Sequence, residues 1–242
     1  YDTIHIGKWH LGLEDENHPC ERGFDEFRGF IDDMMDDYWT HRRYGKNGMR
    51  HNREVIDPEG HATDLFTDWA AETIRSRSDG DRPFFMYLAY NAPHTPIQPP
   101  EEWVETVRTR EPDLDETRIR YNALVEHLDD GVGRVLAALD ASGLADNTIV
   151  VYTSDNGGYI PAGACNDPWR GGKGDMYEGG IRVPCFVRWP GRIAPGSRSD
   201  QTTMLMDFFP TFCELAGVDV THEIEGRSIL SLLKGKSVDF AD

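Results

Sequence analysis

The sequence lacks any apolar run close to the ~18 residues that a helix needs to cross a bilayer, so we expect no membrane span. It is also poor in cations, with 25 Lys and Arg residues against 43 Asp and Glu residues and a net charge of −18. Nucleic acids are bound through basic surfaces, so we expect no nucleic acid among the partners. A binding site for an anion must therefore be made locally positive, by Lys, His or a bound cation.

Cysteine is scarce and its spacing excludes one kind of site. The four cysteines are Cys20, Cys165, Cys185 and Cys213, and no two of them form a C-x-x-C pair, so we expect no structural zinc site. Cys185 and Cys213 lie in apolar runs and are predicted to be buried thiols. The number of cysteines neither supports nor excludes a disulfide between Cys20 and Cys165.

The 242 residues are 38% hydrophobic, which suits one large α/β domain, or a large domain with a fragment of another. Periodicity predicts strands at about 2–6, 83–89, 148–153 and 183–189, and helices at about 63–76, 115–142 and 207–216. This alternation indicates a mostly parallel sheet flanked by helices on both faces. The stretch 32–52 has no clear period and is predicted to be a long irregular loop.

Charged or metal-capable residues follow three of the predicted strands directly. Lys8 and His10 follow the first strand, His94 follows the second, and Asp155 with Asn156 follows the third. Parallel sheets bind ligands just beyond the carboxyl ends of their strands. We therefore expect these residues to converge on one site, suited to an anionic substrate and a hard metal ion.

Lys8 and His10 are two residues apart, so on an extended segment their side chains point the same way. Such a pair can bind an anion or supply a base near neutral pH, and it can equally be a surface pair beside a structural Trp9. His94 lies between Pro93 and Pro96, where a rigid loop can hold an imidazole over a substrate oxygen. The alternative is an ordinary proline-rich surface loop.

The pair Asp155-Asn156 offers the oxygen ligands that Ca²⁺ or Mg²⁺ prefers, although Asp-Asn-Gly-Gly is also strong turn chemistry. Lys173 lies between glycines that allow a ligand to approach the backbone closely. The pattern around it is not a P-loop, and the alternative is a mobile loop lysine.

Several strings of this sequence together resemble the sulfatase family of the alkaline-phosphatase-like superfamily, and the resemblance covers nearly the whole chain apart from 31–60. The strings are GKWHLG at 7–12, RGFDEFRGF at 22–30, PFFMYLAYNAPHTP at 83–96, LDDGVGRVL at 128–136, DNTIVVYTSDNGG at 146–158, RGGKGDMYEGGIRVP at 170–184 and DFFPTFCELAGV at 207–218.

The resemblance implies a role for each candidate residue. Asp155 and Asn156 would be ligands of a divalent cation, Ca²⁺ before Mg²⁺. Lys8 and His10 would orient and deprotonate a formylglycine hydrate, the nucleophile made from Cys or Ser. In the same way, His94 and Lys173 would bind the sulfate oxygens and favour departure of the leaving group. Cations around the peripheral oxygens are what a sulfuryl transition state requires.

One departure from the family's pattern concerns the nucleophile. No Cys or Ser of this sequence is followed by Pro two residues on and by Arg four residues on, and the paired N-terminal aspartates of the metal site are also absent. The resemblance therefore implies an alkaline-phosphatase-like α/β domain truncated at both ends. Residues 1–218 would be a partial catalytic domain, and 219–242 would begin the connection to a small C-terminal subdomain. The fragment alone is expected to be inactive.

The resemblance implies a sulfuric ester hydrolase that acts on a sulfated glycan or an aryl sulfate, with His10 as the base that releases the covalent intermediate. A phosphoesterase or phosphonate ester hydrolase of the same superfamily, and a non-catalytic homologue that binds sulfated ligands, are the alternatives. A periplasmic, secreted or lysosomal location is also implied by the resemblance alone. The sequence leaves the particular sulfate ester and the oligomeric state open.

Overall fold

The computed structural model describes residues 1–78, 80 and 82–236. The chain forms two compact units, of which the first comprises Tyr1–Leu144 with Asp155–Val183 and the second Ala145–Ser154 with Pro184–Asp242. All the candidate site residues belong to the first unit. The single domain expected over 1–218 stays a prediction.

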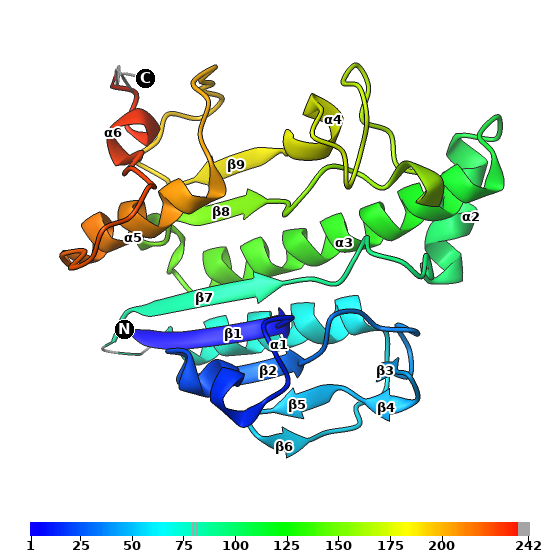
Figure 1. Cartoon of the computed structure of the whole chain (residues 1–242), viewed down its shortest axis with the longest axis horizontal. Coiled ribbons are helices and arrows are strands. Elements are labelled where there is room, and N and C mark those ends of the chain that lie inside the picture. Colours follow the sequence, from blue (N-terminus) through cyan, green and yellow to red (C-terminus); the bar gives the residue numbers. More distant parts are fainter. Residues whose placement is uncertain (79, 81, 237–242) are drawn as a thin grey trace. The chain divides into compact units, whose positions relative to one another are not determined.

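The first unit is built on a five-stranded sheet with the order β6-β5-β2-β1-β7 (Figure 1). Its parallel strands are β1 (Asp2–Lys8), β2 (Glu26–Phe30) and β7 (Phe84–Ala89), and its antiparallel edge is β5 (Met49–His51) and β6 (Glu54–Val55). A separate hairpin joins β3 (Arg42–Arg43) to β4 (Lys46–Asn47). The α/β class with parallel strands at the centre of its sheet is therefore confirmed.

The helices of the first unit are α1 (Ala62–Ser76), α2 (Glu101–Arg110), α3 (Glu116–Ala141) and the short α4 (Glu178–Ile181). Helices α1 and α3 pack on one face of the sheet, and α2 packs on α3. Phe66 of α1 and Leu124 of α3 pack with Ile4 and Ile6 of β1 in one buried cluster. The side chain of Asp115 caps α3 by accepting a hydrogen bond from the Arg118 N–H at 3.1 Å. The two longer predicted helices are confirmed to within one residue at each end.

Outside the stretch 31–60, strand β2, helix α2 and the short α4 of the first unit were not predicted. Strand β2 is short and carries Glu26 and Arg28 among its five residues, so its apolar alternation is weak. Helix α2 buries only Val104 and Val107, and its remaining positions are mostly charged. Strand β2 is held by its pairing with β1 and β5, and α2 packs on Ile119 and Ala123 of the next helix, α3. The pattern of each element alone does not reveal these partners.

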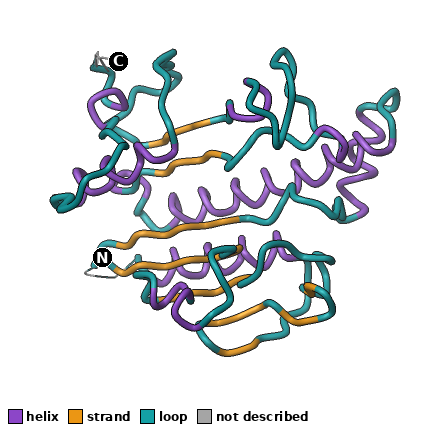
Figure 2. The backbone as a smooth tube through the Cα atoms, in the orientation of Figure 1, coloured by secondary structure: helices purple, strands orange, loops and turns teal. Residues whose placement is uncertain are grey.

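The long stretch between β2 and α1 is largely loop, as expected, and Figure 2 shows it as short strands separated by turns. The opposite face of β1 is covered by the segment that follows the strand. There the ring of His5 meets those of Trp9, Phe24 and Phe27 edge-to-face, each at 5.3 Å between centroids. Trp9 also meets Phe24 edge-to-face at 6.1 Å. The side chains of β1 therefore have buried contacts on both sides of the sheet.

The second unit contains β8 (Val150–Thr153) and β9 (Cys185–Arg188), which pair antiparallel, followed by α5 (Phe208–Ala216) and α6 (Leu230–Leu233). Gly217 ends α5 in the left-handed region at φ 67°, as the sequence predicted. Cys185 is exposed, so the expectation of a buried thiol there was wrong, because the first two residues of β9 are both exposed, and Cys213 is half-buried rather than buried. All four cysteines are free thiols, so no disulfide joins Cys20 to Cys165.

Five 3₁₀ turns complete the described elements, namely η1 (Asp15–Asn17), η2 (Pro19–Glu21), η3 (Ala145–Asn147), η4 (Ile160–Ala162) and η5 (Leu205–Asp207). None of the helices in the described part of the chain is both long and apolar enough to cross a bilayer.

Gly7 lets three strands approach closely just before Lys8. It has φ 106°, and a Cβ at this position would overlap the carbonyl oxygen of Ala89 on β7. We expect Gly7→Ala to lower the free energy of unfolding by about 3 kcal/mol, through backbone strain and overlap with neighbouring backbone atoms. Urea unfolding of the full-length protein measures this change.

Gly133 is the matched control, because it lies inside α3 with open space around the position of a Cβ. Gly133→Ala should raise the free energy of unfolding by up to about 1 kcal/mol. Equal stabilities for the two variants would contradict the close approach at Gly7.

Candidate active site

The parallel pairing of β1 and β7 brings the ends of these strands to one edge of the sheet. Gly7 stands opposite Ala89 in the register, so Lys8, the last residue of β1, lies level with the start of the loop that carries His94. The carboxyl ends of adjacent parallel strands are where α/β proteins bind ligands.

The charges around Lys8 show which side chains surround it. Burial lowers the pKa of the Lys8 ammonium, the carboxylates of Asp155 and Asp33 act to raise it, and the ammonium of Lys173 lowers it further. Lys8 is thus a half-buried cation near two carboxylates and a second lysine. Residues from β1, from the segment after β2 and from the 155–174 loops meet there.

His94 belongs to the same group of charges. Burial lowers the pKa of its imidazole, and the positive charges of Lys173 and Lys8 lower it further, while Asp155 opposes them. Its Nδ1 lies 2.8 Å from the carbonyl oxygen of Thr95, so Nδ1 is the donor and Nε2 is the nitrogen that can face a ligand. The structure therefore brings Lys8, His94, Lys173 and Asp155 together, as the sequence predicted.

Contacts with the stretch between β2 and α1 fix the loop of His94. The buried Tyr38 hydroxyl donates to the His94 carbonyl at 2.9 Å, and the Tyr38 N–H donates to the Gln98 side chain at 2.8 Å. His61, stacked on Tyr38, donates from Nε2 to the Gln98 carbonyl at 3.0 Å. The irregular stretch predicted from sequence thus acts as the support of His94.

Asp155 and Lys173 are joined through backbone contacts of two glycine-rich loops. The Lys173 N–H donates to the Gly158 carbonyl at 3.1 Å, and Asn166 donates to that carbonyl and accepts from the Gly158 N–H, both at 2.9 Å. A Cβ at Gly157 would overlap the carbonyl oxygen of Gly179. The glycines are therefore needed for the loops to pack and to hold the two charged side chains near each other.

The remaining candidate residues are Asn156 and His10. Asn156 donates from its amide nitrogen to the Gly157 carbonyl at 2.9 Å, which orients the side chain beside Asp155. His10 is exposed and has φ 59°, in the left-handed region. Strand β1 ends at Lys8, so the extended geometry from which we expected Lys8 and His10 to point the same way does not hold. The role of His10 stays a prediction.

Asp33 is a member of the site that sequence reasoning missed. Burial acts to raise its pKa, but the hydrogen bond from Arg43 and the Met34 N–H outweigh burial and hold the pKa below its usual range. The Arg43 guanidinium lies 2.7 Å from one carboxylate oxygen of Asp33 and 2.9 Å from the other. The only signal in the sequence was the acidic run at 32–37, which we had assigned to the irregular stretch.

A second cluster of metal-capable residues lies outside this group. His61, Asp64 and His127 offer donor atoms within 4.8 Å of one another, the one such set among the residues described. Both His61 nitrogens are occupied, Nδ1 by the Thr63 N–H and Nε2 by the Gln98 carbonyl, and His127 Nε2 lies 3.1 Å from the Asp64 carboxylate. The cluster is therefore a hydrogen-bonded connection between α1 and α3, and we do not assign a metal to it.

Comparison with known proteins gives the family. The sequence model of the family named Sulfatase matches residues 1–218. Mouse N-acetylgalactosamine-6-sulfatase is 32% identical over 257 residues, covering 99% of this chain and 48% of that protein. Mouse arylsulfatase J is 33% identical over 234 residues, covering 93% of this chain and 38% of that protein.

Solved structures agree with the sequence relatives. The structure of Ps i-CgsB in complex with k-i-k-neocarrahexaose superposes with a TM-score of 0.88 at 33% identity, over 98% of this chain and 56% of that one. The chain belongs to the sulfatase family. It spans about half the length of this structure and of the N-acetylgalactosamine-6-sulfatase.

His5, whose Nε2 lies 2.9 Å from the Lys8 carbonyl, gives a test by pH. Burial lowers its pKa from 6.5 to about 4. The unfolded chain therefore takes up a proton at about pH 6.5 that the folded chain does not take up until about pH 4. The free energy of unfolding should fall by about 3 kcal/mol as the pH decreases through this window.

Urea unfolding between pH 4 and pH 7 measures this slope in the wild type and in His5→Gln, which keeps a hydrogen-bonding side chain. In the variant, the slope of the free energy of unfolding against pH should be smaller by the contribution of about one proton. His222→Gln, at an exposed position, controls for loss of a histidine elsewhere. An unchanged slope in His5→Gln would show that His5 takes up its proton equally in the folded and unfolded chains.

Proposed function

We propose that the protein of which this chain forms part hydrolyses sulfate esters, with a sulfated glycan as the substrate class. The observation that carries the proposal is the meeting of Lys8, His94 and Lys173 at one sheet edge in a chain of net charge −18. Membership in the sulfatase family supports the reaction class. The name N-acetylgalactosamine-6-sulfatase of one relative and the complex of Ps i-CgsB with k-i-k-neocarrahexaose support a glycan.

Lys8, His94 and Lys173 would contact the peripheral oxygens of the sulfate. These oxygens carry negative charge through the reaction, so fixed positive groups in a half-buried site stabilise the transition state. Burial and the two neighbouring lysines lower the pKa of the His94 imidazole, which favours its uncharged form over the imidazolium. We propose that His94 and Lys173 stabilise the departing alcohol oxygen and that Lys8 orients the nucleophile.

The proposed cation site consists of Asp155 and Asn156, with Ca²⁺ preferred over Mg²⁺. The carboxylate and amide oxygens of this pair are the type of ligand that a hard cation prefers. Such an ion would add positive charge next to the sulfate. Formylglycine is the proposed nucleophile, although no Cys or Ser among residues 1–242 stands in the Cys-or-Ser, any, Pro, any, Arg setting. His10 is proposed as the base that acts on it.

Lys173→Ala in the full-length protein tests the cationic group. Within the described residues the exposed Lys173 is hydrogen-bonded through its backbone N–H alone, so the variant should keep its melting temperature within about 2 °C. Loss of a cation at the sulfate should lower kcat/KM for a sulfate ester by about 100-fold or more. Lys236→Ala, at an exposed lysine of the second unit, is the matched control and should keep full activity. Turnover by Lys173→Ala at the wild-type rate would remove Lys173 from the site.

Asp155→Ala tests the cation. The variant of the full-length protein should no longer retain Ca²⁺ after gel filtration, as measured by elemental analysis, because a carboxylate ligand is lost. Asp113→Ala, at an exposed turn position, is the control and should retain the metal content of the wild type. Stoichiometric Ca²⁺ in Asp155→Ala would contradict the proposed ligand set.

A further inference from the structure

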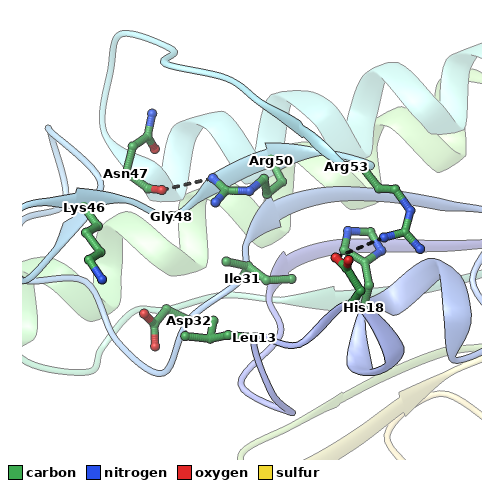
Figure 3. Close-up of a pocket in the computed structure, with 10 residues that line it drawn as sticks. Leu13, His18, Ile31, Asp32, Lys46, Asn47, Gly48, Arg50 and Arg53 are labelled. Atoms are coloured by element: carbon green, nitrogen blue, oxygen red, sulfur yellow. Dashed lines mark hydrogen bonds and ion pairs between the residues drawn. The ribbon is translucent and has the colours of Figure 1, made fainter.

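A cavity of about 420 Å³ lies beside the candidate active site, and none of the proposed catalytic or cation-binding residues lines it. Its walls come from the segment after β1, from the segment after β2, and from the β4–β5 region. Figure 3 shows Lys46 and Arg50 on one side of it and Ile31, Asp32 and Leu13 on the other. This volume is in the range of small-ligand pockets.

The charge of this cavity is opposite to that of the whole protein. Three cationic side chains line it, Lys46, Arg50 and Arg53, against two carboxylates, Asp15 and Asp32. Arg53 is neutralised by ion pairs, with Asp15 at 3.4 Å and with a second carboxylate. Lys46 and Arg50 have no carboxylate partner within the described residues.

Arg50 shows how the fold holds an unpaired cation there. Its guanidinium donates to the carbonyls of Asn47 at 3.0 Å and Met49 at 2.9 Å, which fixes its position. Burial lowers the pKa of this guanidinium, so the charge is partly removed from water without a counter-ion. A partly desolvated cation held by carbonyls alone gains from an anion that enters the cavity.

The apolar wall suits a sugar ring. Ile31 is buried and Leu13 is exposed, and both line the cavity opposite the cations. The C–H faces of a pyranose pack on such aliphatic side chains, while its charged substituents require Lys or Arg. The cavity therefore combines an apolar wall with positive charge.

The cavity adjoins the proposed active site through the segment after β2. Asp32 lines the cavity, and the next residue, Asp33, is among the groups that act on Lys8. Phe30, directly before Ile31, stands opposite Lys8 in the β1–β2 register. A single ligand that extends over this segment reaches both the cavity and the group of Lys8, His94 and Lys173.

We propose that this cavity binds a second acidic group of the substrate, a sulfate ester or a uronate carboxylate, on a sugar near the one whose sulfate lies at Lys8, His94 and Lys173. This inference rests on the proposed function and narrows its substrate class to glycans with at least two acidic groups. Lys46 and Arg50 bind the second group, and Ile31 and Leu13 contact the ring.

The test is the affinity of the full-length protein for a sulfated chondroitin tetrasaccharide, by calorimetry at low salt. Lys46→Ala removes an exposed side chain without a described partner and should raise the Kd about tenfold. Arg50→Gln should do the same, and Lys46→Ala suffices if Arg50→Gln does not fold. Arg75→Ala removes a cation from the exposed end of α1 and should leave the Kd unchanged. An unchanged Kd in Lys46→Ala, or no binding by the wild type, overturns the proposal.

Two further probes identify the acidic group. A desulfated tetrasaccharide keeps only carboxylates, and a carboxyl-reduced one keeps only sulfates. Whichever probe loses affinity in Lys46→Ala carries the group that occupies the cavity, and loss with neither contradicts the proposal.

Turnover of 4-nitrophenyl sulfate separates the two hypotheses. This ester has a single acidic group, so Lys46→Ala should hydrolyse it at the wild-type rate. If the wild type hydrolyses no sulfate ester but binds the tetrasaccharide through Lys46, the proposed function is contradicted. The proposal that the cavity binds an acidic group is then still supported. A fall in this rate equal to the loss of affinity would place Lys46 in the catalytic group and overturn a separate cavity.

Discussion

Repulsion between the ammonium groups of Lys8 and Lys173, which also disfavours the charged form of His94, is the constraint to which the first unit of this protein responds. Burial and the Lys173 ammonium lower the pKa of Lys8, and burial and both lysines lower the pKa of His94, so the cluster requires compensating charge. Asp155 and Asp33 supply the compensating charge, and each is fixed by its own contacts, Asp33 through Arg43 and Asp155 through glycine-rich loops. An anion bound between the cations would relieve the remaining repulsion.

The supporting structure follows from this arrangement. The glycine at position 7 allows β1, β2 and β7 to approach where Lys8 begins the site. Tyr38 and Gln98 hold the loop of His94 from a part of the chain that has little regular structure. A site that collects like charges depends on such contacts, since the charges themselves favour separation.

Sequence periodicity predicted the elements with a long or strictly apolar pattern. Helix α3, with its Asp115 cap and Gly143 stop, and strands β1 and β7 were confirmed nearly to the residue. Strand β2 and helix α2 were missed because their charged residues obscure the apolar pattern. Lys8 and His94 could be predicted because strand ends gather at one edge of a parallel sheet. Asp155 follows β8, which pairs antiparallel with β9 in a separate sheet, and Lys173 was a candidate through its flanking glycines and the family resemblance.

Other features of the site could not be predicted from the sequence. The position of His10 depends on a left-handed backbone angle, and the membership of Asp33 depends on an ion pair with Arg43, ten residues further on. Neither property has a local signal in the sequence. The cavity lined by Lys46 and Arg50 likewise depends on how β4 and β5 fold back over the segment after β2, within a stretch that the sequence shows only as irregular.

Release of inorganic sulfate is the measurement that tests the central claim most directly. The full-length protein would be incubated with a sulfated glycan oligosaccharide and with the corresponding phosphate ester, and free sulfate and phosphate would be measured by ion chromatography. The account predicts sulfate release at a kcat/KM that exceeds the value for phosphate release. Release of phosphate without sulfate, or of neither anion, would contradict a cationic group built for sulfate esters.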